Sequence, residues 1–246
     1  MTVKIKICGV KDIQTAQISK ELGADMIGLV FAESKRQINI STAASIVRSV
    51  GKPLRYLDLD QPPPLMKNNE IQLSQWFLDS HKILDSYLLN KKPLTVGVFA
   101  EQSIEEINQI AEATDIDIVQ LSGKYSFEDA LSINRQTFFS IGISPKDNEV
   151  ELLQRIKPGF SLSLIFDSVS NKHLGGTGET FNWALLDKIN QQIPFILAGG
   201  LNTNNVELAI SSFKPWGVDV SSGIEENGQK NPRLIKEFIN KVRNVK

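Results

Sequence analysis

The 246-residue sequence predicts a single-domain α/β fold in which eight βα units close into a parallel (βα)8 barrel, the TIM barrel. Two observations carry this prediction. Short β-branched apolar runs recur eight times, and each run is followed by a turn and usually by an amphipathic helical pattern. The runs are apolar almost throughout, as suits strands buried on both faces. Eight runs favour a closed sheet, and an open doubly wound sheet is the competing arrangement.

The expected strands are distributed over the whole chain, so we expect one barrel over residues 1–246. The strands are residues 3–7, 26–31, 95–99, 116–121, 138–143, 162–166, 195–198 and 217–220. Helical patterns follow the first three strands at residues 13–22, 41–50 and 104–113.

Residues 51–93 interrupt this alternation between the second helix and the third strand. The segment contains three consecutive prolines (62–64) and then apolar side chains at helical spacing, among them Trp76, Phe77 and Tyr87. Connections from a helix to the next strand lie on the bottom face of a barrel, opposite the loops that build active sites. We therefore expect a helical insertion on the bottom face, with a structural or partner-binding role. Its aromatic residues could cover the barrel or form a dimer contact.

Composition excludes several functional classes. With a formal net charge of −1, the chain lacks the net positive charge that would attract nucleic acid or an anionic membrane. One cysteine and two histidines form neither an internal disulfide nor a zinc site of recognisable spacing. The sequence has no signal-peptide pattern and no run of eighteen apolar residues. We expect a cytoplasmic protein without a metal, although a small anionic ligand remains compatible with this charge.

The active site of such a barrel lies where the strands end and in the loops that follow them. Residues at these positions are therefore the candidates for catalysis and binding. Cys8 ends the first strand and Asp167 ends the sixth, so both should face one pocket, and such a pair suits proton transfer. The alternative for Cys8 is a small buried hydrophobic residue, which is the usual state of a free cysteine. The alternative for Asp167 is a helix cap or a salt bridge.

Glycine-rich turns follow the last two strands. Gly199 and Gly200 follow the seventh strand, and Ser-Ser-Gly at 221–223 follows the eighth. Turns at these two places are the usual phosphate site of a (βα)8 barrel, because their backbone approaches a ligand closely. We also expect Asn202 or Thr203 to cap the helix after the seventh strand.

Seven segments together resemble one enzyme family. They are KIKICGVKD, GADMIGLVFAESKR, VGVFAEQSIEEI, DIVQLSG, GGTGETFNW, FILAGGLNTNNV and VDVSSGIEENGQKNP, in this order. In order and spacing they resemble phosphoribosylanthranilate isomerase of tryptophan biosynthesis, over nearly the whole chain outside the insertion. The resemblance implies a cofactor-free Amadori rearrangement. A phosphorylated aminoaldose, N-(5-phosphoribosyl)anthranilate, would become 1-(2-carboxyphenylamino)-1-deoxyribulose 5-phosphate.

The resemblance also assigns roles to individual residues. It implies that Cys8 is the general base, that Asp167 is the general acid and that Arg36 holds the substrate. A thiol has a pKa of about 8.5, so we expect helix N-termini and Arg36 to lower the pKa of Cys8, and burial to raise that of Asp167. The expected substrate-binding residues are Arg36, Gln120, Gly176, Thr177, Gly199, Gly200, Asp219, Ser221, Ser222 and Gly223.

Three residues depart from the family pattern. Ser122 replaces the histidine of QLHG, Lys35 replaces the proline of SPR, and Glu179 stands where a lysine is common. None of them is Cys8 or Asp167. We therefore expect an active but divergent isomerase, a monomer or a homodimer, with an altered aminoaldose substrate as the alternative.

Other functions fit less well. A pentulose-phosphate epimerase needs a metal cluster and paired aspartates. Indoleglycerol-phosphate synthase uses lysines at strand ends, whereas Lys4 and Lys6 lie within the first strand. A catalytically degenerate barrel that acts as a binding or scaffold protein is the non-enzymatic alternative.

Overall fold

Eight parallel strands pair in chain order and close on one another, because β1 pairs with both β2 and β8. The computed structural model describes residues 2–59, 72–143, 147–168, 189 and 192–245. The strands are β1 Lys4–Cys8, β2 Met26–Val30, β3 Leu94–Phe99, β4 Ile118–Leu121, β5 Gln136–Ile143, β6 Ser163–Ser168, β7 Ile196–Leu197 and β8 Gly217–Val220. The closed barrel is confirmed and the open doubly wound sheet is wrong.

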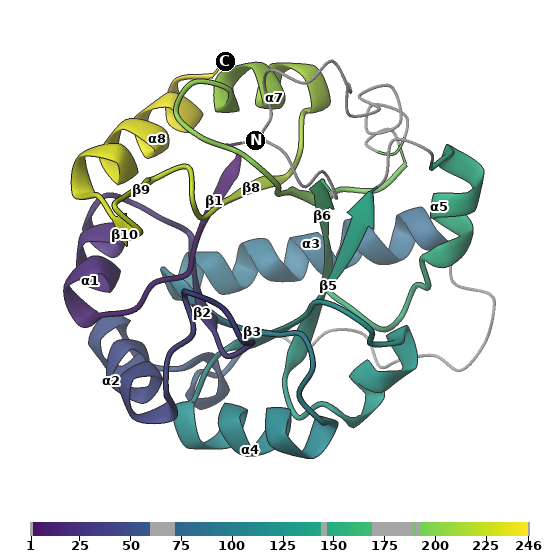
Figure 1. Cartoon of the computed structure of the whole chain (residues 1–246). Coiled ribbons are helices and arrows are strands. Elements are labelled where there is room, and N and C mark those ends of the chain that lie inside the picture. The colour runs from purple at the N-terminus through teal and green to yellow at the C-terminus, as the bar shows by residue number, and fades with distance from the viewer. Residues whose placement is uncertain (1, 60–71, 144–146, 169–188, 190–191, 246) are drawn as a thin grey trace.

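Helices surround the barrel (Figure 1). They are α1 Ile13–Glu21, α2 Ile40–Val50, α4 Ile104–Thr114, α5 Glu149–Arg155, α7 Val206–Phe213 and α8 Pro232–Asn244. Side chains cap several of their N-termini: Asp12 accepts from the Thr15 amide, and Ser103 and Glu106 form a reciprocal capping box. None of the helices in the described part of the chain is long and apolar enough to cross a membrane.

Two connections differ from the expected strand–helix alternation. A 3-10 helix, η2 (Phe127–Ser132), takes the place of an α-helix between β4 and β5. A short antiparallel hairpin of β9 (Glu225–Glu226) and β10 (Gln229–Lys230) lies between β8 and α8. This hairpin brings charged side chains to the end of β8, next to the expected site.

Successive strand residues face opposite sides of the sheet, and β1 shows what this means for the barrel. Ile5 and Ile7 are fully buried in the large apolar cluster that also contains helix residues such as Ala16 and Ile235, so they face the helices. Lys4, Lys6 and Cys8 have the opposite parity and face the inside of the barrel. Most other strands place apolar side chains inside, among them Met26, Val96, Ile118, Phe138 and Ile196.

The long helix α3 (Leu73–Asn90) crosses the barrel at the ends where strands begin (Figure 1). Trp76 Nε1 donates to the carbonyl oxygen of Ser161, just before β6, at 2.8 Å. Asp85 forms an ion pair of 2.9 Å with Lys4, the first residue of β1. Phe77 and Tyr87 are also buried, so these three aromatic residues of α3 pack within the chain itself.

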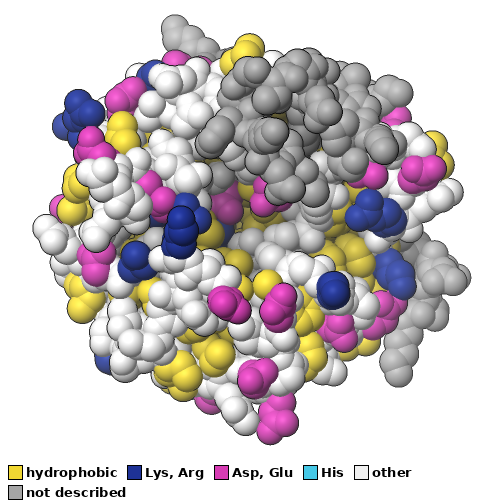
Figure 2. Space-filling model, viewed as in Figure 1, with side chains coloured by type: hydrophobic (Ala, Val, Ile, Leu, Met, Phe, Trp, Pro, Cys, Tyr) yellow, Lys and Arg dark blue, Asp and Glu magenta, His cyan; other side chains and the backbone are white. Residues whose placement is uncertain are grey.

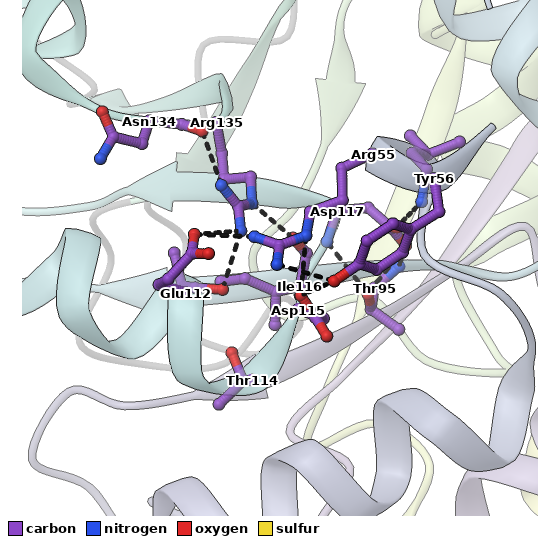
Figure 3. Close-up of polar contacts among 12 residues, drawn as sticks. Arg55, Tyr56, Thr95, Glu112, Thr114, Asp115, Ile116, Asp117, Asn134 and Arg135 are labelled. Carbon is purple, nitrogen blue, oxygen red and sulfur yellow. Dashed lines mark hydrogen bonds and ion pairs between the residues drawn. The ribbon is translucent and has the colours of Figure 1, made fainter. Parts of the chain in front are cut away.

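A polar cluster at the starts of β4 and β5 ties the segment after α2 to α4 (Figure 3). The Arg55 guanidinium, in the 3-10 helix η1 (Leu54–Tyr56), lies 2.7 Å from Glu112 and 2.9 Å from Asp115. Arg135 donates to the carbonyl oxygens of Ala111 and Ile116 and contacts Glu112. A cavity of about 360 Å³ lies beside this cluster. Both guanidiniums are already engaged by chain oxygens, so the cluster braces the bottom of the barrel.

Candidate active site

The residues expected to carry chemistry gather where the strands end. In the view of Figure 2, which looks onto these ends, the centre of the face is hollowed, and acidic and basic side chains lie around the hollow. Cys8 ends β1, Gln120 lies near the end of β4, Asp167 near the end of β6 and Asp219 within β8. The parallel register therefore brings residues up to 211 positions apart to one end of the barrel.

Cys8 lies among polar side chains where β1, β2 and β8 pair with one another. Lys6 is completely buried on the same face of β1, and its Nζ is 3.0 Å from Asp219 Oδ2 on β8. Opposite Cys8, β2 carries Gly28. A Cβ on Gly28 would be 2.8 Å from the Cys8 sulfur and 3.1 Å from Lys6 Nζ. The missing side chain of Gly28 thus provides the space in which the thiol and the ammonium group meet.

Opposing effects act on the ionisation of Cys8. The side chain keeps some solvent contact, but protein atoms surround the thiol, and this burial raises its pKa. The neighbouring Lys6 ammonium lowers the pKa, the Asp219 carboxylate raises it, and Lys230 lowers it. The net direction is upward. Our expectation that helix N-termini and Arg36 lower this pKa is wrong, because burial outweighs the cations and the cation with the largest effect is Lys6.

Arg36 is held at the mouth of the site by Glu225. Its Nε and one terminal nitrogen donate to the two carboxylate oxygens at 2.6 and 2.8 Å, a bidentate pair. Lys230 Nζ lies 2.6 Å from the same carboxylate. Hydrogen bonding from Arg36 and from Lys230 outweighs burial and holds the pKa of Glu225 at about 2. The Arg36 chain passes over Gly9, where a Cβ would be 2.5 Å from Arg36 Cδ.

Gln120 belongs to a small hydroxyl network between the end of β4 and the middle of β5. Its Nε2 donates to Ser122 Oγ at 3.1 Å and to Ser140 Oγ at 2.9 Å, and the two hydroxyls are 2.9 Å apart. Within the described residues Gln120 Oε1 is buried without a hydrogen-bond partner. Ser122, where the family pattern has histidine, is thus part of an uncharged network that leaves one amide oxygen for a ligand.

The two glycine turns expected to bind phosphate lie side by side. Gly199 and Gly200 have φ of +88° and +64°, which favour glycine. Gly223 pairs with Asn202, and a Cβ on Gly223 would be only 1.9 Å from the carbonyl oxygen of Leu201. Close contact between the turns therefore requires glycine at 223. Ser221 links them to Cys8, because its Oγ is 3.0 Å from the Cys8 carbonyl oxygen.

The helix after β7 is not capped as expected. Asn205 is the N-cap of α7, and its side chain accepts from the Asn202 amide at 2.8 Å. The Asn202 side chain accepts from the Asn204 amide instead, so both asparagines shape the turn. The prediction that Asn202 or Thr203 caps α7 is wrong, because the turn is two or three residues longer than expected before the helix begins.

Asp167 lies on β6 beside Gly142 of β5, and its side chain is exposed. We expected this carboxyl group to be buried, and the structure does not bury it. Gly176 and Thr177 lie outside the described residues, as do His173 and Glu179. No group of three histidine, cysteine, aspartate or glutamate side chains that could hold a metal ion occurs in the part of the chain that the structure describes.

Sequence reasoning missed Lys6, Glu225 and Lys230. For Lys6 a signal was present, because the alternation in KIKIC puts Lys6 and Cys8 on the same face of one strand. For Glu225 and Lys230 no local signal exists, because both reach the site through the β9–β10 hairpin.

Comparisons with known proteins point to one family. The family model for N-(5'-phosphoribosyl)anthranilate isomerase matches residues 66–241. An enzyme of that name from Wickerhamomyces anomalus is 39% identical over 238 residues, which cover 96% of this chain and 97% of the relative. The solved structure of phosphoribosylanthranilate isomerase from Thermotoga maritima has a TM-score of 0.69 and 28% identity, covering 98% of each chain. Another, described as a complex with reduced 1-(o-carboxyphenylamino)-1-deoxyribulose 5-phosphate, has a TM-score of 0.67, 26% identity and the same coverage.

Proposed function

The chain belongs to the N-(5'-phosphoribosyl)anthranilate isomerase family, and on this premise we propose that Cys8 and Asp167 are the general base and the general acid of its reaction. The enzyme is an aldose–ketose isomerase of tryptophan biosynthesis. It converts N-(5'-phosphoribosyl)anthranilate into 1-(2-carboxyphenylamino)-1-deoxyribulose 5-phosphate. The residue roles within this reaction are our proposal.

Two proton transfers account for the rearrangement. Protonated Asp167 donates to the ring oxygen of the sugar, so that the C1′–O bond breaks and a protonated imine forms. The Cys8 thiolate then removes the proton from C2′ and leaves an enolamine. The enolamine becomes the ketone when its hydroxyl proton is lost and C1′ gains a proton. The cycle ends with a thiol and a carboxylate, and one proton passing from Cys8 to Asp167 through solvent restores the starting state.

The observation that carries this proposal is the position of Cys8. Its thiol lies inside the barrel at the end of β1, beside a buried ammonium group and a carboxylate. An inert structural cysteine would lie among apolar side chains, whereas charged neighbours are typical of a cysteine that ionises. The exposed carboxyl group of Asp167 lies at the same end of the barrel, where bound substrate would exclude water from it.

The remaining site residues hold the substrate in this proposal. Arg36 binds the anthranilate end of the substrate, with its orientation set by Glu225. The backbone of the paired glycine turns, together with the hydroxyls of Ser221 and Ser222, binds the phosphate. We assign Gly176, Thr177, Gln120 and Asp219 to substrate binding as well.

The test is a turnover assay on freshly generated phosphoribosylanthranilate with Cys8→Ser and Asp167→Asn. General acid–base groups typically contribute about 10² to 10⁴ in rate, so we expect each variant to lose at least about 10² in kcat. Asp79→Asn is the matched control, because Asp79 is half-exposed on α3 at the opposite end of the barrel, where it contacts Gln75 and Lys82. It should keep the wild-type rate.

Two outcomes would count against the assignment. If either site variant keeps the wild-type kcat, that residue is not the acid or base. If the folded wild-type chain does not turn over this substrate but turns over another aminoaldose, the substrate has shifted. Circular dichroism of each variant separates loss of chemistry from loss of fold.

We further propose that the enzyme works in the cytoplasm on a small phosphorylated substrate, as a monomer or a homodimer. One related solved structure, 26% identical, is described as monomers made from a dimeric isomerase of Thermotoga maritima. Size-exclusion chromatography with light scattering decides between the two states.

A further inference from the structure

A buried ion pair beside Cys8 has no part in the acid–base scheme above. Lys6 has no exposed surface and Asp219 is 9% exposed, and Lys6 Nζ is 3.0 Å from Asp219 Oδ2. Charges buried away from water are costly to a fold, and a pair of apolar residues would fill the same space at lower cost. Other strands do place apolar residues inside the barrel, as with Met26 and Val96. The pair therefore calls for an explanation in the function of the site.

The geometry joins this pair to the thiol. Lys6 and Cys8 are two residues apart on β1 and face the same way. The Cys8 sulfur and Lys6 Nζ both border the space that Gly28 leaves open, at 2.8 and 3.1 Å from the position of a Cβ. Asp219 uses one carboxylate oxygen for Lys6, and its other oxygen is buried without a hydrogen-bond partner among the described residues. Ammonium, thiol and carboxylate thus form one compact group.

Resting on the proposed role of Cys8 as the base, we propose that Lys6 is a positioning residue that stabilises the Cys8 thiolate, and that Asp219 limits this effect. The ammonium donates to the thiolate when the proton leaves sulfur. The carboxylate holds the ammonium in place and neutralises part of its charge, so that the thiolate stays basic enough to take a proton from carbon.

The charges around the thiol agree with this assignment. Burial alone would lower the pKa of Lys6, but Asp219 and Cys8 outweigh it and raise that pKa, so Lys6 remains an ammonium ion. For Cys8, burial raises the pKa, Lys6 opposes it most strongly, and Asp219 adds to it. Lys230 on β10 also lowers the Cys8 pKa, and among the described residues Arg36 is a further cation that interacts with Cys8. The facing residue of β2 is Gly28, which carries no charge.

Because Cys8 is the only cysteine of the chain, alkylation reports on its thiolate alone. The experiment measures the rate of iodoacetamide alkylation of the folded enzyme by mass spectrometry, over about pH 6 to 10. Lys6→Met should move the midpoint of the rate profile upward by about one pH unit or more, which slows alkylation near neutral pH about tenfold. Asp219→Asn should move the midpoint downward and speed alkylation.

Lys4→Met is the matched control, because Lys4 lies on the same face of β1 but pairs with Asp85 of α3 at the other end of the barrel. Its profile should match that of the wild type. If the ion pair has only a structural role, the alkylation midpoints of Lys6→Met and Asp219→Asn should shift in the same direction. That result would overturn the proposal. So would a wild-type midpoint in Lys6→Met.

If Lys6→Met does not fold, because it leaves Asp219 unpaired, the double variant Lys6→Met/Asp219→Asn removes both charges. Its midpoint should still lie above that of the wild type, since the effect of Lys6 exceeds that of Asp219, and a midpoint at or below the wild-type value contradicts the proposal. Alkylation does not depend on turnover. Failure of the proposed catalytic role would appear instead as an active Cys8→Ser enzyme.

Discussion

At the scale of single residues, Glu225 determines how Arg36 enters the site. It accepts both guanidinium hydrogen bonds, and its pKa of about 2 keeps it ionised at all physiological pH values. Because the pKa is lowered on folding, the stability that this carboxylate contributes is complete above its ordinary pKa of about 4.5. It is lost as the pH falls from there towards about 2. Arg36 is therefore held in one orientation before substrate arrives.

We predict that Glu225→Gln raises KM for phosphoribosylanthranilate about fivefold and changes kcat less. A charge-assisted hydrogen bond contributes roughly 1.5–3 kcal/mol when buried, and partial solvent exposure of Arg36 reduces this to about 1 kcal/mol. Steady-state kinetics checks the prediction. Glu226→Gln is the control, because Glu226 is exposed and contacts Asn231 instead of Arg36. Equal effects of the two variants would contradict it.

At the scale of elements, α3 contributes a buried histidine to the floor of the barrel. His81 Nε2 is 3.0 Å from Ser163 Oγ, and the ring packs against Trp216 with the ring centres 4.6 Å apart. Burial lowers the pKa of His81 to about 3. The folded chain therefore keeps this ring neutral, whereas the unfolded chain protonates it near pH 6.5. The stability it contributes is complete above pH 6.5 and declines as the pH falls from 6.5 towards 3.

His81→Gln should consequently make the fold less sensitive to acid. Between about pH 7 and pH 4.5, we expect the wild-type unfolding free energy to fall by about 2 kcal/mol more than that of the variant. Urea unfolding at a series of pH values measures this difference. The control is His173→Gln, which removes the other histidine of the chain and should retain the wild-type pH dependence. If it instead loses that dependence, the titrating group is not His81.

At the scale of the whole molecule, the last helix joins the chain back to its first strand. Arg243 of α8 donates to the carbonyl oxygens of Val3 and Gly23 and lies 2.7 Å from Asp25. Asp25 is buried and accepts from the Ile5 amide at 2.9 Å. Together with the pairing of β1 and β8, these bonds close the barrel between the two ends of the chain.

Arg243→Met should therefore destabilise the whole barrel. Removing the arginine takes a charged partner from a buried carboxylate, and we expect a loss of about 2 kcal/mol in the unfolding free energy. Chemical denaturation of the two proteins gives the value. Arg48→Met is the matched control, since Arg48 is exposed on α2 and, among the described residues, forms one long hydrogen bond of 3.3 Å, to Ser45. It should change stability by less than about 0.5 kcal/mol. If Arg243→Met lowers the unfolding free energy no more than Arg48→Met does, the hydrogen bonds of Arg243 do not stabilise the closed barrel.

The architecture of the chain could be predicted closely from local patterns. The expected eighth strand, residues 217–220, coincides with β8, and the other strands differ from expectation by one or two residues at one or both ends. Hydrophobic periodicity and caps are properties of neighbouring residues, so they are visible without the fold. The 3-10 helix η2 and the β9–β10 hairpin escaped prediction, because neither has a length or a period that marks it.

The sequence by itself determined which residues stand at strand ends, including Cys8, Asp167 and the glycine turns. Only the tertiary structure decided how these residues are charged and held. Lys6 meets Asp219 across 213 positions, and Arg36 meets Glu225 across 189. Strand ends follow from the order of residues along the chain, whereas electrostatic effects depend on distances through space and on burial, which exist only once the barrel has closed.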